Sequence, residues 1–204
     1  MKFDEFKIKR KIIRNIKKVP ERIKIEARRK LEREKALMLK EFDSHPVTNE
    51  IEAGPDSGNS SGTLGGTGNL FSFIGFPRGT FPTEIIRFML NDYRITNLHT
   101  PRIKRRVGVG GIDFIFRIKG PDMTDIERQT YLSWLGKSWV RGIERGLSGI
   151  GYYLYYSGVS GNEKHSRSGS AIQSRYQLRG GSFRPTAYLS AIIKTFLQKV
   201  RRVV

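Results

Sequence analysis

Apolar residues recur at helical intervals through the first 42 residues of the chain. The first of them, at steps of three and seven, are Phe3, Phe6, Ile13 and Ile16. The residues between them are mostly Lys, Arg and Glu, which favour helix. Proline cannot donate its amide inside a helix, so Pro20 predicts a kink or a break. A second segment opens at Glu21, and its apolar residues are Ile23, Ala27, Leu31, Met38 and Phe42. The pattern predicts a basic helical arm over residues 1–42, either as two helices or as one bent helix.

Two apolar segments, residues 70–76 and 82–93, follow farther along the chain. Residues 70–76, LFSFIGF, are bounded by Asn69 and Pro77, which predicts either a buried strand or a strand paired with a neighbour's sheet. An RNA-stacking strand would need a basic residue and a glycine ahead of its aromatic residues, and neither is in place here. Residues 82–93 predict a short helix, with the apolar residues Ile85, Ile86, Met89 and Leu90 on one side of it.

Residues 102–119 predict a β-hairpin with a glycine turn at 108–111. In its second strand, four apolar residues alternate with Asp113, Ile115 and Arg117. The four are Ile112, Phe114, Phe116 and Ile118. Because successive side chains of a strand point to opposite faces, these four share one face, and we expect that face to be buried.

Further helices and one strand complete the pattern. Asp122 or Thr124 can cap a helix, whose apolar stripe consists of Ile126, Leu132, Leu135, Trp139, Ile143 and Leu147. Residues 150–156 predict a strand, and the chain closes with an amphipathic helix from about Thr186.

These elements predict an α+β fold. A small antiparallel sheet packs with two or three helices in a core domain over residues 70–204, and residues 1–42 extend from it as the basic helical arm.

Residues 43–69 join the two parts and are acidic, rich in Gly and Ser, and free of Lys and Arg. This composition predicts a long loop. Such loops are uncommon in small domains unless they are functional or order on binding. We therefore expect it to contact a neighbouring subunit, and we expect its Gly-rich part, residues 54–68, to order only in the assembly. Its glycines are Gly54, Gly58, Gly62, Gly65, Gly66 and Gly68. They lack the following Lys and Ser/Thr of a phosphate-binding loop, which excludes that motif.

The charge of the chain is strongly positive and unevenly distributed. The 204 residues include 38 Lys and Arg against 19 Asp and Glu, a formal net charge of +19. Residues 1–40 carry 16 bases and 6 acids, residues 41–69 carry 5 acids and no base, and residues 70–204 carry 22 bases and 8 acids. Such a chain attracts polyanions or acidic protein surfaces. The N-terminal segment is either a solvated helix face or an arm that docks on nucleic acid or on an acidic partner.

Four cations fall within five residues of the predicted hairpin, the densest positive cluster outside the arm. They are Arg102, Lys104, Arg105 and Arg106. Two interpretations stay open: they contact phosphates, or they are ordinary edge-strand charges that deter aggregation.

The sequence offers little for catalysis. It has no cysteine, which excludes disulfides, thiolate metal sites and cysteine nucleophiles. His45, His99 and His165 lie 54 and 66 residues apart, without the spacing of a helical metal site. Acid pairs such as Asp122 and Asp125 are explained by helix capping. We expect no enzyme, no metal and no cofactor. The remaining alternative is an active site, such as that of a nuclease, assembled from residues distant in sequence.

No apolar run approaches the length of about 18 residues that a membrane-spanning helix needs. The first residues, MKFDEFKIKRK, lack the apolar stretch of a secretory signal. We therefore expect a soluble protein made in the cytoplasm, without a membrane partner.

Two segments carry a family resemblance. Near the C-terminus, the residues Gly181-Ser182-Phe183-Arg184-Pro185-Thr186-Ala187-Tyr188-Leu189 lead into the last predicted helix. Near the front, the basic helix leads into His45-Pro46-Val47-Thr48, with Gly62-Thr63-Leu64 downstream. The first segment resembles the closing Arg-Pro, aromatic or Leu, and terminal helix of the tail-completion or neck (head–tail joining) proteins of long-tailed bacteriophages. The second is similar to their Pro-Val-x-Thr-Gly-x-Leu, here stretched by an insertion at 49–61. About half of the chain is covered.

The resemblance implies a structural subunit of a homo-oligomeric ring in the neck or at the tail end, assembled in the host cytoplasm and located in the virion. Its implied partners are copies of itself, neighbouring head–tail connector, tail-terminator or tail-tube proteins, and genomic DNA through nonspecific contact. Under this hypothesis the four clustered cations face the DNA channel or an acidic neighbouring ring. The principal alternative is a basic nucleic-acid-binding protein, ribosome-associated or chromatin-like, which the charge supports equally well.

Overall fold

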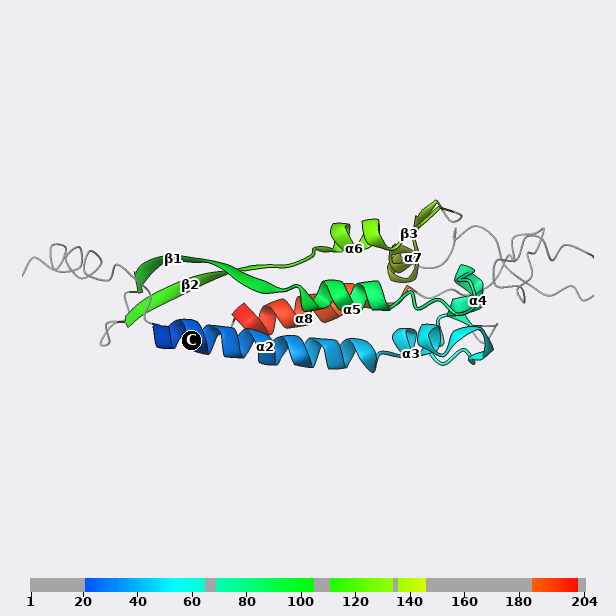
Figure 1. Ribbon diagram of the computed structural model, residues 1–204, viewed down its shortest axis with the longest axis horizontal. Helices are drawn as coiled ribbons and strands as arrows, with labels where there is room; N and C mark the ends of the chain where they lie inside the picture. The colour runs from blue at the N-terminus through cyan, green and yellow to red at the C-terminus, as the bar shows by residue number, and fades with distance from the viewer. Residues whose placement is uncertain (1–20, 65–68, 105–110, 134–135, 146–184, 202–204) are drawn as a thin grey trace, which may run out of the picture.

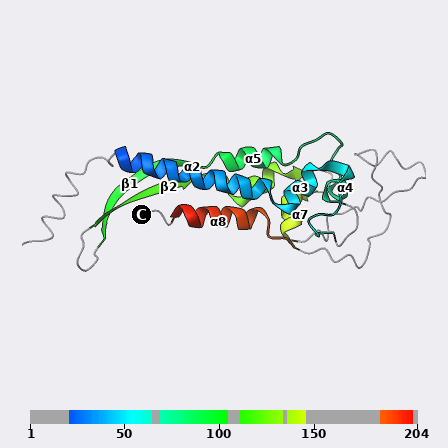
Figure 2. The same ribbon diagram turned by 90° about the horizontal axis from the view of Figure 1, so that it is seen from below.

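Three helices lie side by side along the long axis of the molecule (Figure 1). The structure, a computed structural model, describes residues 21–64, 69–104, 111–133, 136–145 and 185–201. The three helices are α2 (Glu21–Asp43), α5 (Glu84–Asn91) and α8 (Leu189–Arg201). Figure 2 shows α2 between α5 and α8, and both of these run antiparallel to it. The described part of the chain is thus a mixture of helices and small antiparallel sheets, consistent with the predicted α+β class.

The second half of the predicted arm is part of the core. In α2, Leu31, Met38 and Phe42 are buried and follow one another at steps of seven and four, so they share the face that packs on α5 and α8. Residues 1–20, with the predicted break at Pro20, lie outside the described residues. One hydrophobic cluster draws residues from α2, from the segment 43–69 and from the predicted core domain.

The last predicted helix is confirmed as α8, which begins at Leu189, three residues later than expected. Its first amides have no partner within the helix. The Glu144 carboxylate of α7 (Trp139–Arg145) supplies one: it accepts hydrogen bonds from the backbone N–H groups of Tyr188 (3.1 Å) and Ser190 (2.9 Å) and from the Ser190 hydroxyl (2.5 Å). α7 and α8 are therefore tied at the start of α8.

The predicted strand over 70–76 is wrong, because residues Leu70–Ile74 form helix α4. The Asn69 side chain accepts a hydrogen bond from the Ser72 amide at 2.9 Å, which caps the helix. Gly75 ends it with a φ of 82°, a left-handed conformation that favours glycine. The segment is buried as expected, but the Asn69 cap and the left-handed Gly75 favour a helix over a strand.

The predicted hairpin is confirmed and is longer than expected. β1 (Arg94–Lys104) pairs antiparallel with β2 (Gly111–Lys119), so β1 begins eight residues before the predicted start. The pairing shifts register between His99 and Arg102, where Pro101 has no N–H to donate to a ladder. Among the described residues, neither strand pairs with a third strand. The hairpin forms one end of the molecule in Figure 1.

The long helix predicted after Asp122 is also wrong, although its start is confirmed. Asp122 and Asp125 form a reciprocal capping box at the start of α6 (Met123–Gln129). The chain then turns through a short pair of strands, β3 (Tyr131–Leu132) and β4 (Lys137–Ser138), before α7. The hydroxyl of Thr130 bonds to the Ile126 carbonyl and to the Ser138 hydroxyl, both at 2.7 Å, which stabilises the break.

The segment 43–69 differs from the predicted loop. It contains α3 (Pro46–Glu52) and the 3-10 turn η1 (Gly54–Asp56). The fully buried Glu50 carboxylate accepts hydrogen bonds from the amides of Ser61 and Leu70, both at 2.7 Å. The Asn69 side chain donates to the carbonyls of Pro55 (2.7 Å) and Ser57 (2.9 Å). Contacts within the chain therefore hold residues 54–64, and the ordering of residues 54–68 in an assembly stays a prediction.

Of the six loop glycines, Gly54, Gly58 and Gly62 lie in this ordered part, and Gly65, Gly66 and Gly68 lie outside the described residues. Their contact with a neighbouring subunit stays a prediction. The strand predicted over 150–156 lies outside the described residues as well.

Candidate polyanion-binding site

At the root of the β1–β2 hairpin, apolar and basic side chains alternate between its two faces. Ile95 and Ile118 are register partners, are partly buried and pack against the hydrophobic core. Their neighbours Arg94, Arg117 and Lys119 are exposed. The alternation follows from the period of two along a strand. The expected burial of one face is thus borne out for Ile118, whereas the side chains of Ile112 and Phe114 lie outside the described part of the chain.

The register assigns five cations to the other face, which we call the basic face. By register it comprises Arg94, Arg102, Lys104, Arg117 and Lys119, of which the structure describes the side chains of Arg94, Arg117 and Lys119. Positions 111, 113, 117 and 119 of β2 share one side of the strand, and Arg94, Arg102 and Lys104 of β1 pair with three of them. By register, the only acid on this side is Asp113, opposite Arg102. Over the nine residues of β2 the face is about 30 Å long. Over residues 94–119 the sequence holds seven bases and one acid.

Charges on the basic face are poorly neutralised. Arg94 and Lys119 are directly opposite each other, and like charges in this position destabilise a strand pair. Arg94 lies 3.9 Å from the Asp92 carboxylate, but both side chains are more than half exposed, so the ion pair is weak. Arg117 and Lys119 make no ion pair within the described part of the chain. An anion on this face would relieve the repulsion.

The four cations predicted from the sequence fall in two groups. Arg102 and Lys104 lie near the end of β1 and belong to the basic face by register. Arg105 and Arg106 lie outside the described residues. The prediction missed Arg94, Arg117 and Lys119. Two of these were visible in the sequence, because Arg117 and Lys119 alternate with the apolar residues of the second strand.

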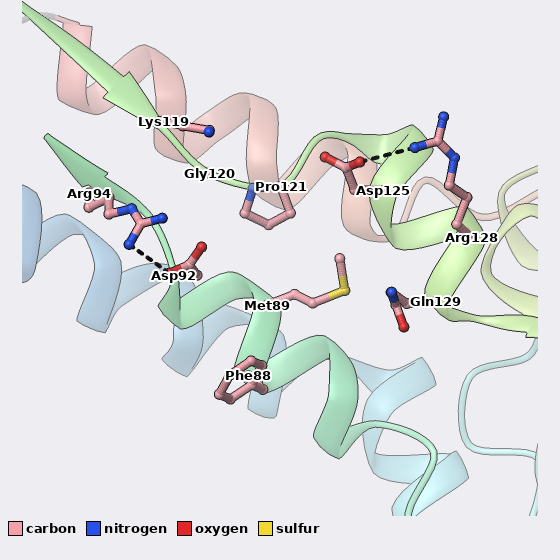
Figure 3. A pocket seen from close by; sticks show the side chains of 10 residues that line it. All are labelled: Phe88, Met89, Asp92, Arg94, Lys119, Gly120, Pro121, Asp125, Arg128 and Gln129. Atoms are coloured by element: carbon pink, nitrogen blue, oxygen red, sulfur yellow. Dashed lines mark ion pairs between the residues drawn. The ribbon is translucent and has the colours of Figure 1, made fainter. Parts of the chain in front are cut away.

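A groove of about 400 Å³ continues the basic face at the root of the hairpin (Figure 3). α5 contributes Phe88 and Met89, and α6 contributes Asp125, Arg128 and Gln129. The other lining residues are Asp92, Arg94, Lys119, Gly120 and Pro121. Arg128 lies 3.6 Å from Asp125, with both side chains about half exposed or more. The groove is therefore lined by both apolar and charged residues.

Tyr93 fixes the root of the hairpin to the helices. Its hydroxyl donates to the Pro121 carbonyl at 2.7 Å, and its ring lies 4.8 Å from the ring of Phe196 in α8. Burial, with the nearby carboxylates of Asp122 and Asp125, raises the pKa of Tyr93 to about 12, so the hydroxyl stays protonated as a donor. The ring covers Gly120 closely, which leaves no room for a side chain there.

The two segments that carry the family resemblance meet in the core. The Thr48 hydroxyl and the Tyr188 hydroxyl are 2.6 Å apart and buried, and the rings of His45 and Tyr188 lie 4.8 Å apart. Burial raises the pKa of Tyr188. Val47 and Leu64 are buried in the same cluster. These residues hold α3 against the start of α8, and they form a packing contact rather than an exposed site.

His45 gives this contact a pH dependence. Its Nδ1 accepts a hydrogen bond from the Val47 amide at 3.2 Å and caps α3, and burial lowers the pKa of His45 below its usual 6.5. The unfolded chain therefore binds a proton first as the pH falls below about 6.5, so stability is lost toward the lower folded pKa. Since Asn also caps helices well, His45→Asn should lack this loss.

Urea unfolding of both proteins at pH 8.0, 7.0, 6.0 and 5.0 measures the effect. The difference in free energy of unfolding between wild type and variant should shift toward the variant below pH 6.5. A loss of ring contact with Tyr188 adds a constant offset at every pH. Parallel curves over the whole range would contradict the assignment.

Within the described residues, no group of three or more His, Asp or Glu side chains could hold a metal ion. In the same part of the chain, no helix is both long and apolar enough to cross a membrane. On the described surface, the basic face presents three exposed cations, Arg94, Arg117 and Lys119, with one weak ion pair between Arg94 and Asp92. No family model, curated protein or solved structure matches the chain.

Proposed function

We propose that the protein is a structural subunit of a bacteriophage neck or tail-completion ring, in which the basic face lines the channel for DNA. The observation that carries the proposal is a hairpin with a cationic outer face whose strands pair with no third strand in the described part of the chain. The family resemblance of residues 45–48, 62–64 and 181–189 supports the location in a virion.

The free edges of the hairpin support assembly. A two-stranded hairpin alone is marginally stable, and its outer edges leave backbone groups available for strand addition by a neighbour. The same contact repeated between identical copies is heterologous, and it closes into a ring when the rotation between copies permits. Assembly would thus place one hairpin per subunit at equivalent positions around an axis.

The basic face supports contact with DNA that slides. Lys and Arg attract phosphates without reading the base sequence, and salt screens this attraction. A face about 30 Å long with five cations can follow a phosphate backbone without holding one sequence in place. Two acids in the groove, Asp92 and Asp125, limit the attraction at the root of the hairpin.

Neutralising the described cations of the basic face should weaken nonspecific DNA binding. The triple variant Arg94→Gln, Arg117→Gln, Lys119→Gln removes up to three phosphate contacts, so the slope of log K against log salt should flatten by about 2–3. Fluorescence anisotropy with duplex DNA at 50–300 mM salt, about the range in which such contacts are screened, measures it.

A matched triple variant provides the control. Arg28→Gln, Arg29→Gln and Lys40→Gln remove the same charge from exposed positions on α2. This control should leave most of the slope in place. An equal change in both triples would assign DNA binding to net charge and not to the basic face.

The mass of the purified protein separates the ring from the alternative. Light scattering at low and high salt, with and without duplex DNA, should show a closed oligomer that survives high salt without DNA, and negative-stain images should then show its symmetry. A monomer that assembles only on DNA and dissociates as salt rises would favour the basic nucleic-acid-binding protein instead, a reading that the basic face supports as well.

A further inference from the structure

One face of α5 is apolar, exposed and edged by acids. Phe81, Ile85 and Phe88 are 63%, 38% and 75% exposed. They follow one another at steps of four and three, so they lie on one side of the helix and of the turn before it. Glu84 and Asp92 stand four residues before and after Phe88 on the same side. We call these five residues the α5 stripe.

The α5 stripe does not belong to the core of its own subunit. The residues of α5 that pack inward are Ile86 and Leu90, which are fully buried. Arg87 flanks the stripe, but it is neutralised by Asp43 at 2.8 Å and by Glu52 at 2.6 Å, and hydrogen bonding to Glu52 raises its pKa.

The acids of the stripe remain available. Glu84 makes no ion pair in the described part of the chain, and Asp92 has only its 3.9 Å contact with Arg94. The chain as a whole has a net charge of +19, whereas the α5 stripe carries acids and no base.

We propose that the α5 stripe binds residues 1–20 of a neighbouring copy of this chain. That segment carries eight bases and two acids, and its apolar residues at helical steps are Phe3, Phe6, Ile13 and Ile16. A basic amphipathic helix is complementary to an apolar face edged by carboxylates, because its apolar side covers the Phe and Ile side chains and its cations reach the acids. The inference requires self-association only, and it holds whether or not the assembly belongs to a virion.

The geometry favours a neighbour over the same chain. α2 starts at Glu21, at the hairpin end, whereas α5 runs antiparallel to α2 and contacts it from Lys35 to Asp43. Phe88 therefore lies roughly 27 Å along α2 from Glu21, and Phe81 lies farther. A helix of 20 residues is about 30 Å long, so a segment that reversed at once at Pro20 would end before it covered Phe81. A neighbouring copy has no such limit.

Cross-linking tests the inference directly, because the natural chain has no cysteine. One full-length variant carries Phe88→Cys, and a second, of different mass through a tag, carries Cys in place of Phe6, Ile13 or Ile16 in turn. A mixture of the two, oxidised mildly, should form a disulfide between unlike chains for at least one arm position. The matched control is Gln198→Cys, which is exposed on α8. Its yield should be at least about tenfold lower.

A peptide tests the same contact without substitution. A synthetic peptide of residues 1–20, in excess over the full-length protein, should compete for the α5 stripe and lower the mass measured by light scattering. A peptide of the same composition with its apolar residues dispersed should not. The variant Phe81→Ser, Phe88→Ser should also have lower mass, and circular dichroism checks that its fold is retained, since both side chains are exposed.

Three results would overturn the inference. The first is equal cross-linking yield for Phe88→Cys and Gln198→Cys. The second comes from a chain that carries both Phe88→Cys and an arm cysteine, if its disulfide forms only within that chain. The third is an oligomer whose mass changes neither with the peptide nor in the Phe81→Ser, Phe88→Ser variant. The last result would leave ring assembly intact and remove only the arm contact. Conversely, a trans cross-link together with an unchanged salt slope for DNA would support the arm contact and count against the DNA channel.

Discussion

Replacing Gly120 by alanine is expected to lower the free energy of unfolding by about 3 kcal/mol. A Cβ at this position would lie closer than 3.0 Å to three ring carbons of Tyr93. The ring cannot move away easily, because it packs on Phe196 and its hydroxyl bonds to the Pro121 carbonyl. Either the ring or the root of the hairpin must shift, and both cost packing. Urea unfolding followed by circular dichroism measures the loss.

Gly58→Ala is the matched control, since a Cβ there meets nothing within 4 Å and the backbone is not left-handed. It should change stability by less than about 0.5 kcal/mol. In a double-mutant cycle, Gly120→Ala should cost little once Tyr93→Ala has removed the ring. Additive losses in the cycle would show that the clash with Tyr93 is not the cause.

A second loss of about 3–4 kcal/mol is expected for Glu50→Ala. The carboxylate is fully buried and accepts the amides of Ser61 and Leu70, so its removal leaves two donors without a partner and opens a cavity. Glu50→Gln keeps the volume and one acceptor oxygen, and it should lose about half as much. Hydrogen exchange adds a local readout, because the Ser61 and Leu70 amides should exchange faster in both variants.

Glu26→Gln is the control for this prediction, because Glu26 lies on the exposed face of α2 in a surface ion pair with Arg22. Its effect on stability should stay within about 0.5 kcal/mol. If Glu50→Ala proved as mild as Glu26→Gln, the buried carboxylate would not be the anchor of residues 54–64.

Sequence periodicity predicted the elements that contact one another along the chain. The hairpin, α5 and α8 each have an amphipathic pattern of sufficient length. Burial follows the pattern in α8, whereas in α5 Ile86 and Leu90 are buried and Ile85 is exposed. The secondary-structure predictions are wrong at places where a local hydrogen bond or a glycine, and not the apolar pattern, determines the backbone conformation. Residues 70–74 have the composition of a strand, but the Asn69 cap and the left-handed Gly75 select a helix. The stripe from Ile126 to Ile143 is regular, yet Thr130 and Ser138 bond across a turn that interrupts it.

The candidate site was predicted only in part. The cluster at Arg102 and Lys104 stands out as a run of charge, whereas the basic face depends on register. Arg94 and Lys119 are 25 positions apart in the sequence, and only the pairing of β1 with β2 places them opposite each other. The same holds for Glu50, whose partners Ser61 and Leu70 have no pattern that reveals them in advance.

The anchoring of Tyr93 makes the hairpin a lever. Tyr93 immediately precedes β1, its hydroxyl bonds to the chain just after β2, and its ring rests on Phe196 of α8. A sideways force on the hairpin therefore acts about a fulcrum that is fixed to the C-terminal helix. Because the strands extend away from Tyr93, a small sideways force along them produces a large torque, which the few contacts of Tyr93 must resist. We expect mechanical load on the hairpin to reach α8 through Tyr93, and to reach α2 through its own contacts with β1.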